Sequence, residues 1–94
     1  MTNAIDELTV NYEEAGQLVT KELDKIVLTR GAWTTILYRY QDWDNSKQEY
    51  SADKYTIRRY QKRNNQYQQK SKFNISSKDQ AKKIIETLSE WIEE

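Results

Sequence analysis

The sequence contains no cysteine and no histidine, and only two glycines, Gly16 and Gly31. Without cysteine there are no disulfides and no thiolate metal sites. The lack of histidine removes the commonest general base, the commonest zinc ligand and the base of a nucleophilic triad. Two glycines far apart also make no glycine-rich phosphate-binding loop. These absences favour a binding protein over an enzyme, and we expect neither a metal nor an organic cofactor.

Long hydrophobic runs are missing as well. The longest purely aliphatic run covers residues 26–28, far short of the roughly 20 residues that span a membrane. Residues 1–7 lack the basic start and the apolar stretch of a secretory signal. We therefore expect a cytoplasmic protein that does not insert into a membrane.

The chain has 94 residues, enough for one small domain. Hydrophobic residues make up 36% of it and charged residues 32%, against typical shares of about 45–50% and about 25%. So few apolar residues are not enough to fill the hydrophobic core of a monomer well. This composition therefore favours association with a second copy of the chain.

The formal net charge is zero, but the charges are segregated along the chain. Residues 1–24 contain one basic and six acidic residues, whereas residues 54–83 contain ten basic residues and one acidic residue. Residues 84–94 contain four acidic residues and no basic one. Such segregation is a cue for a polyanionic partner, although a well-solvated sheet face has the same pattern.

The C-terminal segment has the clearest periodicity. Apolar side chains recur at helical spacing from Ala81 to Ile92. Ser77, followed three residues later by Gln80, has the form of a capping box. The sequence therefore predicts a helix over about residues 77–92.

Upstream of this helix the apolar period changes from 3.6 to 2. Aromatic and β-branched residues, or strict alternation, predict strands over about residues 23–29, 33–43, 54–62 and 66–75. Asn64-Asn65 tolerates left-handed backbone conformations and predicts a hairpin tip between the last two strands.

The expected fold class is α+β, a four-stranded antiparallel meander sheet followed by a C-terminal helix. These elements form one domain over residues 23–94, and residues 1–22 are expected to form a loosely attached acidic arm. Ile36, Tyr38 and Tyr40 share one face of their strand and are expected to pack beneath the helix.

Alternation within the strands predicts that cations and aromatic rings share the other, wet face of the sheet. Cations neutralise phosphates, and rings stack on unpaired bases at about 1–3 kcal/mol each. The bases of a duplex already stack on one another, so this face suits a single strand of DNA or RNA. The candidate nucleic-acid-binding residues are Trp33, Arg39, Trp43, Lys54, Arg58, Tyr60, Lys62, Lys70 and Lys72, with Leu37 between the rings.

Three other interpretations remain open. Trp33, Leu37 and Trp43 could belong to a core or a dimer interface, and the aromatic face or the helix stripe could dock another protein. Asp42 and Asp44 could hold Mg²⁺ in a nuclease. Acids that flank a turn are common, however, because they hydrogen-bond the backbone there.

Two segments of the chain resemble a known family. Residues 36–43, Ile-Leu-Tyr-Arg-Tyr-Gln-Asp-Trp, are similar to the second strand of the Positive Cofactor Four-like transcriptional coactivators, which ends in Trp. Residues 72–76, Lys-Phe-Asn-Ile-Ser, are similar to that family's entry into its helix, although Phe73 stands where the family has glycine. The order of elements over residues 23–92 also resembles, more distantly, the Whirly proteins.

The resemblance implies a homodimer whose helices pack together and whose curved sheets grip single-stranded DNA with little sequence preference. A role in transcription or DNA maintenance would follow. By matching position, Trp43 would be the stacking aromatic, and the residues facing phosphates would be Lys54, Arg58, Lys62, Lys70 and Lys72.

Overall fold

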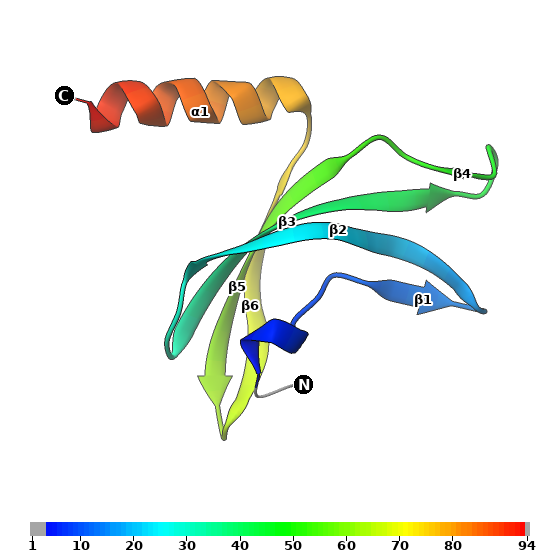
Figure 1. Cartoon of the computed structure of the whole chain (residues 1–94), viewed down its shortest axis with the longest axis horizontal. Helices are drawn as coiled ribbons and strands as arrows, with labels where there is room; N and C mark the ends of the chain where they lie inside the picture. The colour runs from blue at the N-terminus through cyan, green and yellow to red at the C-terminus, as the bar shows by residue number, and fades with distance from the viewer. Residues whose placement is uncertain (1–3, 94) are drawn as a thin grey trace.

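The structure is a computed structural model that describes residues 4–93. An antiparallel sheet is followed by one C-terminal helix (Figure 1), so the expected α+β class is confirmed. The elements are a short 3₁₀ helix η1 (Ile5–Glu7), the strands β1 (Tyr12–Glu14), β2 (Gln17–Thr29), β3 (Trp33–Asp44), β4 (Glu49–Tyr50), β5 (Lys54–Arg63) and β6 (Gln66–Ile75), and the helix α1 (Lys78–Ile92).

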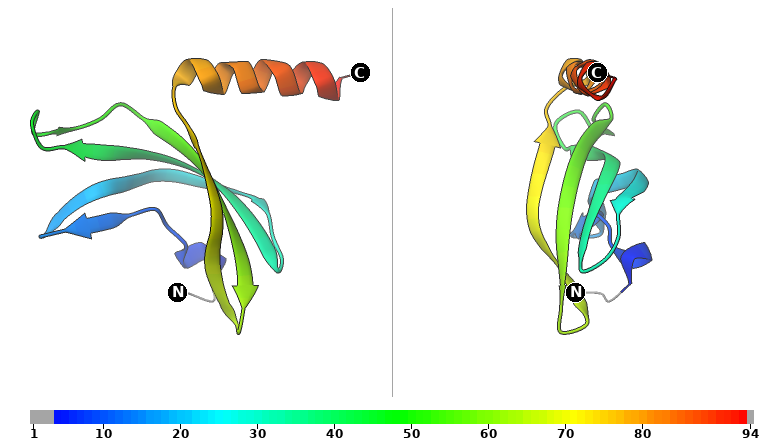
Figure 2. Two further views of the ribbon diagram at one scale, coloured as in Figure 1. Left: turned by 180° about the vertical axis from the view of Figure 1, so that it is seen from behind. Right: turned by 90° about the vertical axis from the view of Figure 1, so that its left-hand side faces the viewer.

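The sheet has more strands than the four expected. Five strands lie side by side in the order β1-β2-β3-β5-β6, and β4 pairs with β3 off this path. Together they curl into a half-barrel (Figure 2). The two missed strands, β1 and β4, are three and two residues long, and segments this short show no alternation that a sequence pattern could reveal.

Two tight turns of the same kind connect neighbouring strands. Asn64 and Asn65 join β5 to β6 with φ angles of 51° and 66°, at the predicted hairpin tip. Ala15 and Gly16 join β1 to β2 with φ angles of 49° and 82°. Two consecutive positive φ values match the right-handed twist of paired strands, so each residue pair fixes a hairpin.

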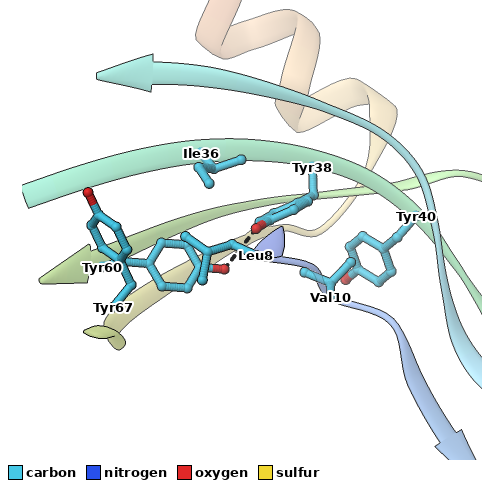
Figure 3. Close-up of a cluster of buried hydrophobic side chains, with 7 residues drawn as sticks. All are labelled: Leu8, Val10, Ile36, Tyr38, Tyr40, Tyr60 and Tyr67. Carbon is cyan, nitrogen blue, oxygen red and sulfur yellow. Dashed lines mark hydrogen bonds between the residues drawn. The ribbon is translucent and has the colours of Figure 1, made fainter. Parts of the chain in front are cut away.

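Buried side chains gather on one face of the half-barrel, which we call the inner face. Ile36, Tyr38 and Tyr40 alternate along β3 and point to it, and Tyr60 of β5 and Tyr67 of β6 join them (Figure 3). Residues directly opposite each other in antiparallel neighbours lie on the same face. The intervening residues of each strand therefore define the outer face.

The N-terminal segment covers the inner face. Leu8 and Val10 are only 5% and 7% exposed and belong to the same core. Residues 12–14 and 17–22 lie in β1 and β2. The structure thus corrects the expectation of a loosely attached arm over residues 1–22, of which residues 1–3 lie outside the described part. The reason is that the inner face needs an apolar cover, and this segment supplies it.

The helix α1 begins and ends where the sequence predicts, with Ser77 as its N-cap. The Ser77 hydroxyl accepts a hydrogen bond from the Gln80 N–H at 3.1 Å, and the Gln80 side chain accepts one from the Ser76 N–H at 2.7 Å. Yet no described residue of α1 is buried, and the helix projects beside the sheet from the end of β6 (Figure 1). Packing of Tyr38 and Tyr40 beneath this helix is therefore a wrong prediction, because Leu8 and Val10 occupy that place.

Candidate nucleic-acid interface

The strand register decides which of the predicted site residues share a face. Ile36 pairs with Arg58, and Leu37 pairs with Ile57, across β3 and β5. Arg58 therefore lies on the inner face with Ile36, whereas Leu37 lies on the outer face. The register divides the expected binding face: Trp33, Arg39 and Trp43 lie on the outer face, and Lys54, Arg58, Tyr60, Lys62 and Lys72 lie on the inner one.

Lys70 lies in a β-bulge of β6. Ser71 pairs with Arg59 while Gln69 pairs with Tyr60, so Lys70 is the extra residue of the strand. An extra residue reverses the facing of everything beyond it, and Tyr67 consequently faces inward while Phe73 faces outward. Strict alternation would put both rings on one face, and nothing in the sequence of this strand signals the bulge.

Two of the outer-face candidates are engaged within the protein. The Trp43 ring packs edge-on against Tyr50 with centroids 5.0 Å apart. The Arg39 guanidinium lies 3.3 Å from a carboxylate oxygen of Asp53 and 3.9 Å from one of Asp24. Neither side chain is free to meet a nucleic acid without giving up these contacts.

Several inner-face candidates are engaged as well. The Tyr60 hydroxyl is buried and shares a hydrogen bond of 2.9 Å with the Tyr38 hydroxyl. The Lys54 ammonium is 3.0 Å from a carboxylate oxygen of Asp42. Arg58 donates to the Gln69 side chain at 2.8 Å. Tyr60 in particular cannot stack on a base while the N-terminal segment covers it.

A different group of cations meets where the β5–β6 hairpin lies beside the loop between β2 and β3. The Lys62 N–H donates to the Ala32 carbonyl at 2.7 Å, and the Tyr67 hydroxyl donates to the Gly31 carbonyl at 3.1 Å. These two bonds hold the loop and the hairpin side by side. We call this region the basic end and define it by Arg30, Trp33, Arg59, Lys62 and Arg63.

Aromatic and cationic groups are in direct contact at the basic end. Trp33 is 40% exposed, and the Arg59 guanidinium lies 4.2 Å from the centroid of its ring. The Lys62 ammonium lies 5.6 Å from the centroid of Tyr67. The hairpin tip adds an open polar hollow of about 520 Å³, lined by Gln61, Lys62, Arg63, Asn64 and Gln68.

The charges of the basic end are not neutralised by neighbours. Within residues 4–93 the ion pairs involve Arg39 and Lys54, and none involves Arg30, Arg59, Lys62 or Arg63. No acidic residue occurs in residues 25–41 or 54–78, which supply this end of the sheet. Like charges held together without carboxylates make a region of positive potential that attracts an anion.

Sequence reasoning had missed Arg30, Arg59 and Arg63. Alternation places Arg59 on the side opposite Arg58, which removed it from the predicted wet face. The order of the predicted strands nevertheless contained a signal that could have brought these three residues together. In an antiparallel meander the turn before the second predicted strand and the turn after the third fall at the same end of the sheet, so basic residues beside these two turns meet whichever face they occupy.

An apolar groove of about 520 Å³ separates the outer face from α1. The sheet contributes Leu37 and Ile57 to its lining, and the helix contributes Ile84, Ile85 and Leu88. Farther along α1, Trp91 and Ile92 are 66% and 77% exposed. The apolar stripe predicted for the helix is therefore largely uncovered.

The two candidate metal ligands serve local structure. Asp44 accepts hydrogen bonds from the Ser46 hydroxyl at 2.7 Å and from the N–H groups of Ser46 and Lys47 at 3.0 and 3.2 Å. These bonds, the hydroxyl first, lower the pKa of its carboxyl. Asp42 accepts from Thr20 and pairs with Lys54. Among residues 4–93 no three histidine, cysteine or acidic side chains are grouped so that they could hold a metal ion.

No helix in the described part of the chain is long and apolar enough to cross a membrane.

Comparisons of the chain with models of protein families, with curated proteins and with solved structures give no significant match. Function is therefore inferred from the geometry of the site alone.

Proposed function

We propose that this protein binds single-stranded nucleic acid, with low sequence specificity, through the basic end. The observation that carries the proposal is the group of four cations without ion-pair partners in the described structure, beside the exposed indole of Trp33. A non-catalytic, cytoplasmic role in transcription or DNA maintenance belongs to the same proposal.

The chemistry of these groups fits a flexible polyanion with exposed bases. Arg59, Lys62 and Arg63 would contact phosphates and release condensed counterions. Trp33 offers a π-face on which any base can stack. Neither kind of contact distinguishes one base from another, so we expect binding with little sequence preference. Because the phosphate contacts are ionic, we also expect binding to weaken as salt rises.

Fluorescence anisotropy with single-stranded and duplex oligonucleotides across a salt series tests the proposal. Lys62→Ala with Arg63→Ala should weaken single-strand binding and reduce the slope of log K against log salt by about 1.4, or roughly 0.7 for each phosphate that is no longer neutralised. The matched control is Lys21→Ala with Lys47→Ala, which removes the same charge outside the basic end. Equal effects of the two double variants, or no binding by the unaltered protein, would contradict the proposal.

A pair of tryptophan variants tests the stacking contact. Trp33→Ala should weaken binding by roughly 5- to 150-fold, which corresponds to a cost of about 1–3 kcal/mol, and leave the salt slope unchanged. Trp43→Ala should change affinity little, because that ring already packs on Tyr50. If Trp43→Ala weakens binding more than Trp33→Ala does, Trp43 is the stacking residue, as the family resemblance implies.

A second function, association with another protein chain, is supported by the uncovered stripe of α1. A helix of fifteen residues that buries none of them is only marginally stable by itself in water. We propose a second copy of this chain as the partner. The basic residues of α1 lie in its first half and the acidic ones, apart from Asp79, in its second, so an antiparallel arrangement of two helices brings opposite charges together.

Sedimentation velocity tests this association. Trp91→Ala with Ile92→Ala should convert a dimer to a monomer, whereas Ser89→Ala, which removes neither a charge nor an apolar side chain from the same helix, should leave the dimer intact. A monomeric unaltered protein at concentrations well above those used for binding would exclude the homodimer.

A further inference from the structure

Residues 4–11, which we call the strap, cross the inner face of the sheet. The Leu8 and Val10 side chains of the strap contact the core that contains Tyr38, Tyr40 and Tyr60 (Figure 3). The strap belongs to no strand, and η1 is its one regular element. It therefore lacks the ladder of backbone hydrogen bonds that fixes the strands beneath it.

The hydrogen bonds that join the strap to β2 each involve a side chain. The Lys25 ammonium donates to the backbone carbonyls of Ile5, Asp6 and Leu8 at 3.2, 3.0 and 2.6 Å. The Asn11 side-chain oxygen accepts from the Glu22 N–H at 2.6 Å, and the Thr9 hydroxyl donates to the Glu22 carboxylate at 2.6 Å. The strap is thus held by Leu8, Val10 and the partly buried Ile5, together with these side-chain hydrogen bonds.

The surface beneath the strap combines aromatic rings with cations. Tyr38, Tyr40, Tyr60 and Tyr67 lie on the inner face. The register places five cations on the same face, namely Lys25, Lys54, Arg58, Lys62 and Lys72, of which Lys54 is paired with Asp42. Cations interleaved with rings are what single-strand-binding surfaces present. Lys62 also belongs to the basic end, so the two surfaces are continuous.

We propose that the strap is a built-in competitor of the nucleic acid, and that a bound single strand displaces it and extends from the basic end onto the inner face. This inference rests on the proposed single-strand binding. The exchange is favourable in charge, because the Lys25 ammonium now meets three neutral carbonyls and would instead meet a phosphate. Bases stacked on the tyrosines would replace the contacts of Leu8 and Val10.

The strap also adds an electrostatic contribution to this competition. Asp6 and Glu7 are exposed at its start, so the displaced segment carries away negative charge that would otherwise repel the incoming strand. With the strap in place, the four tyrosines of the inner face are buried. Once the strap is released, the inner face offers both rings and cations.

Two strap variants test the inference by anisotropy with a labelled oligothymidine. Leu8→Ala with Val10→Ala removes the two buried apolar contacts of the strap and leaves that of the partly buried Ile5. Thr9→Ala with Asn11→Ala removes hydrogen bonds while leaving the core side chains in place. Each should tighten binding, at least tenfold for the first, and should leave the salt slope unchanged, because the bound strand makes the same phosphate contacts once the strap is displaced. Leu23→Ala with Leu28→Ala, two exposed residues of β2, is the matched control and should bind as the unaltered protein does.

Hydrogen exchange on the unaltered protein gives an independent measurement. Addition of the oligonucleotide should accelerate amide exchange over residues 4–11 while protecting β5 and β6. Circular dichroism shows whether the Leu8→Ala with Val10→Ala variant is folded. If it is not, the Thr9→Ala with Asn11→Ala variant and the exchange measurement test the inference instead.

The outcomes separate this inference from the proposal beneath it. Folded strap variants with unchanged affinity, together with unchanged exchange over residues 4–11, overturn the inference. If the basic-end variants still weaken binding in that case, single-strand binding survives and only the strap's role is rejected. If the basic-end variants have no effect, both fail.

Discussion

At the scale of single residues, the Tyr38 and Tyr60 hydroxyls form a hydrogen bond inside the apolar core. Both rings are buried, and each hydroxyl has the other as its partner at 2.9 Å. Among the described residues no buried side-chain nitrogen or oxygen lacks a hydrogen bond. The core tolerates polar groups because they are paired.

Removing one of these hydroxyls should therefore cost more than removing both. Tyr38→Phe leaves the Tyr60 hydroxyl buried without its partner, and we expect the free energy of unfolding to fall by about 1–3 kcal/mol. Tyr38→Phe with Tyr60→Phe removes both polar groups and should be less destabilising than Tyr38→Phe alone. Urea unfolding of the three proteins measures the difference, and a double variant that is less stable than the single one would refute this account.

The same pair predicts how stability depends on pH. Burial raises the pKa of the Tyr38 hydroxyl, and its hydrogen bond to Tyr60 raises it further. Burial also raises the pKa of Tyr60. Because an unfolded tyrosine ionises near pH 10, the folded state holds these protons more tightly than the unfolded state above that pH.

The stabilisation by these protons is complete below about pH 10 and is lost as the pH rises beyond it toward the folded-state values. We expect the urea midpoint to fall steeply above this pH in the unaltered protein. The Tyr38→Phe with Tyr60→Phe variant should lose less over the same interval. Equal losses in both proteins would assign the pH dependence to other groups.

At the scale of elements, α1 is joined to the sheet through β6 and buries no described residue. Its stability within one chain therefore depends on local interactions, chiefly the Ser77 cap and the Gln80 bond that completes it. A helix held in this way can fray without unfolding the half-barrel.

Ser77→Ala should accordingly destabilise the helix by about 1 kcal/mol, the usual cost of losing an N-cap side chain. We expect lower helical circular dichroism and faster amide exchange at the start of α1, while the unfolding midpoint of the sheet changes little. Ser71→Ala, the same substitution at a serine of β6, is the control. A matching drop in the midpoint of the sheet would show that α1 and the half-barrel unfold together.

At the scale of the whole molecule, charge is distributed between two ends of the sheet. The basic end contains Arg30, Arg59, Lys62 and Arg63, whereas Asp42 and Asp44 lie at the opposite end of β3. The zero net charge therefore hides a separation of charge along the sheet. Such a molecule would approach a polyanion with one end first, and salt would weaken that steering.

The whole molecule also presents apolar surface that one copy leaves uncovered, along α1 and the outer-face groove. If two copies bury it together, the melting temperature should rise with protein concentration, because association stabilises the folded state by mass action. Trp91→Ala with Ile92→Ala should remove this dependence. A melting temperature independent of concentration in the unaltered protein would contradict dimerisation.

Features that depend on near neighbours in the chain could be predicted from the sequence. The Ser77 cap with the apolar period of residues 81–92, and the Asn64-Asn65 turn with its flanking alternation, each contain their own signal. The Ala15-Gly16 turn was not predicted from the sequence, although both residues have positive φ angles. The three-residue strand before it was not predicted either, since it is too short to show a period.

The prediction that the site residues share one face was wrong because it required distant segments to be aligned. Alternation gives each strand two faces, but it does not say which face of β3 matches which face of β5. The pairing of Leu37 with Ile57 settles that question, and the bulge at Lys70 reverses β6 once more. The aromatic and cationic residues of the expected single face therefore came to lie on both sides of the sheet.

The sequence alone thus determined the helix, the strands β3, β5 and β6, the hairpin tip and the segregation of charge, because all of these are local properties of the chain. Only the tertiary structure decided which apolar segment covers the sheet. Leu8 with Val10 and the stripe of α1 were both available for that role, and the strap occupies the inner face while α1 stays beside the outer one. Such a choice depends on packing between residues far apart in the chain, which local periodicity does not encode.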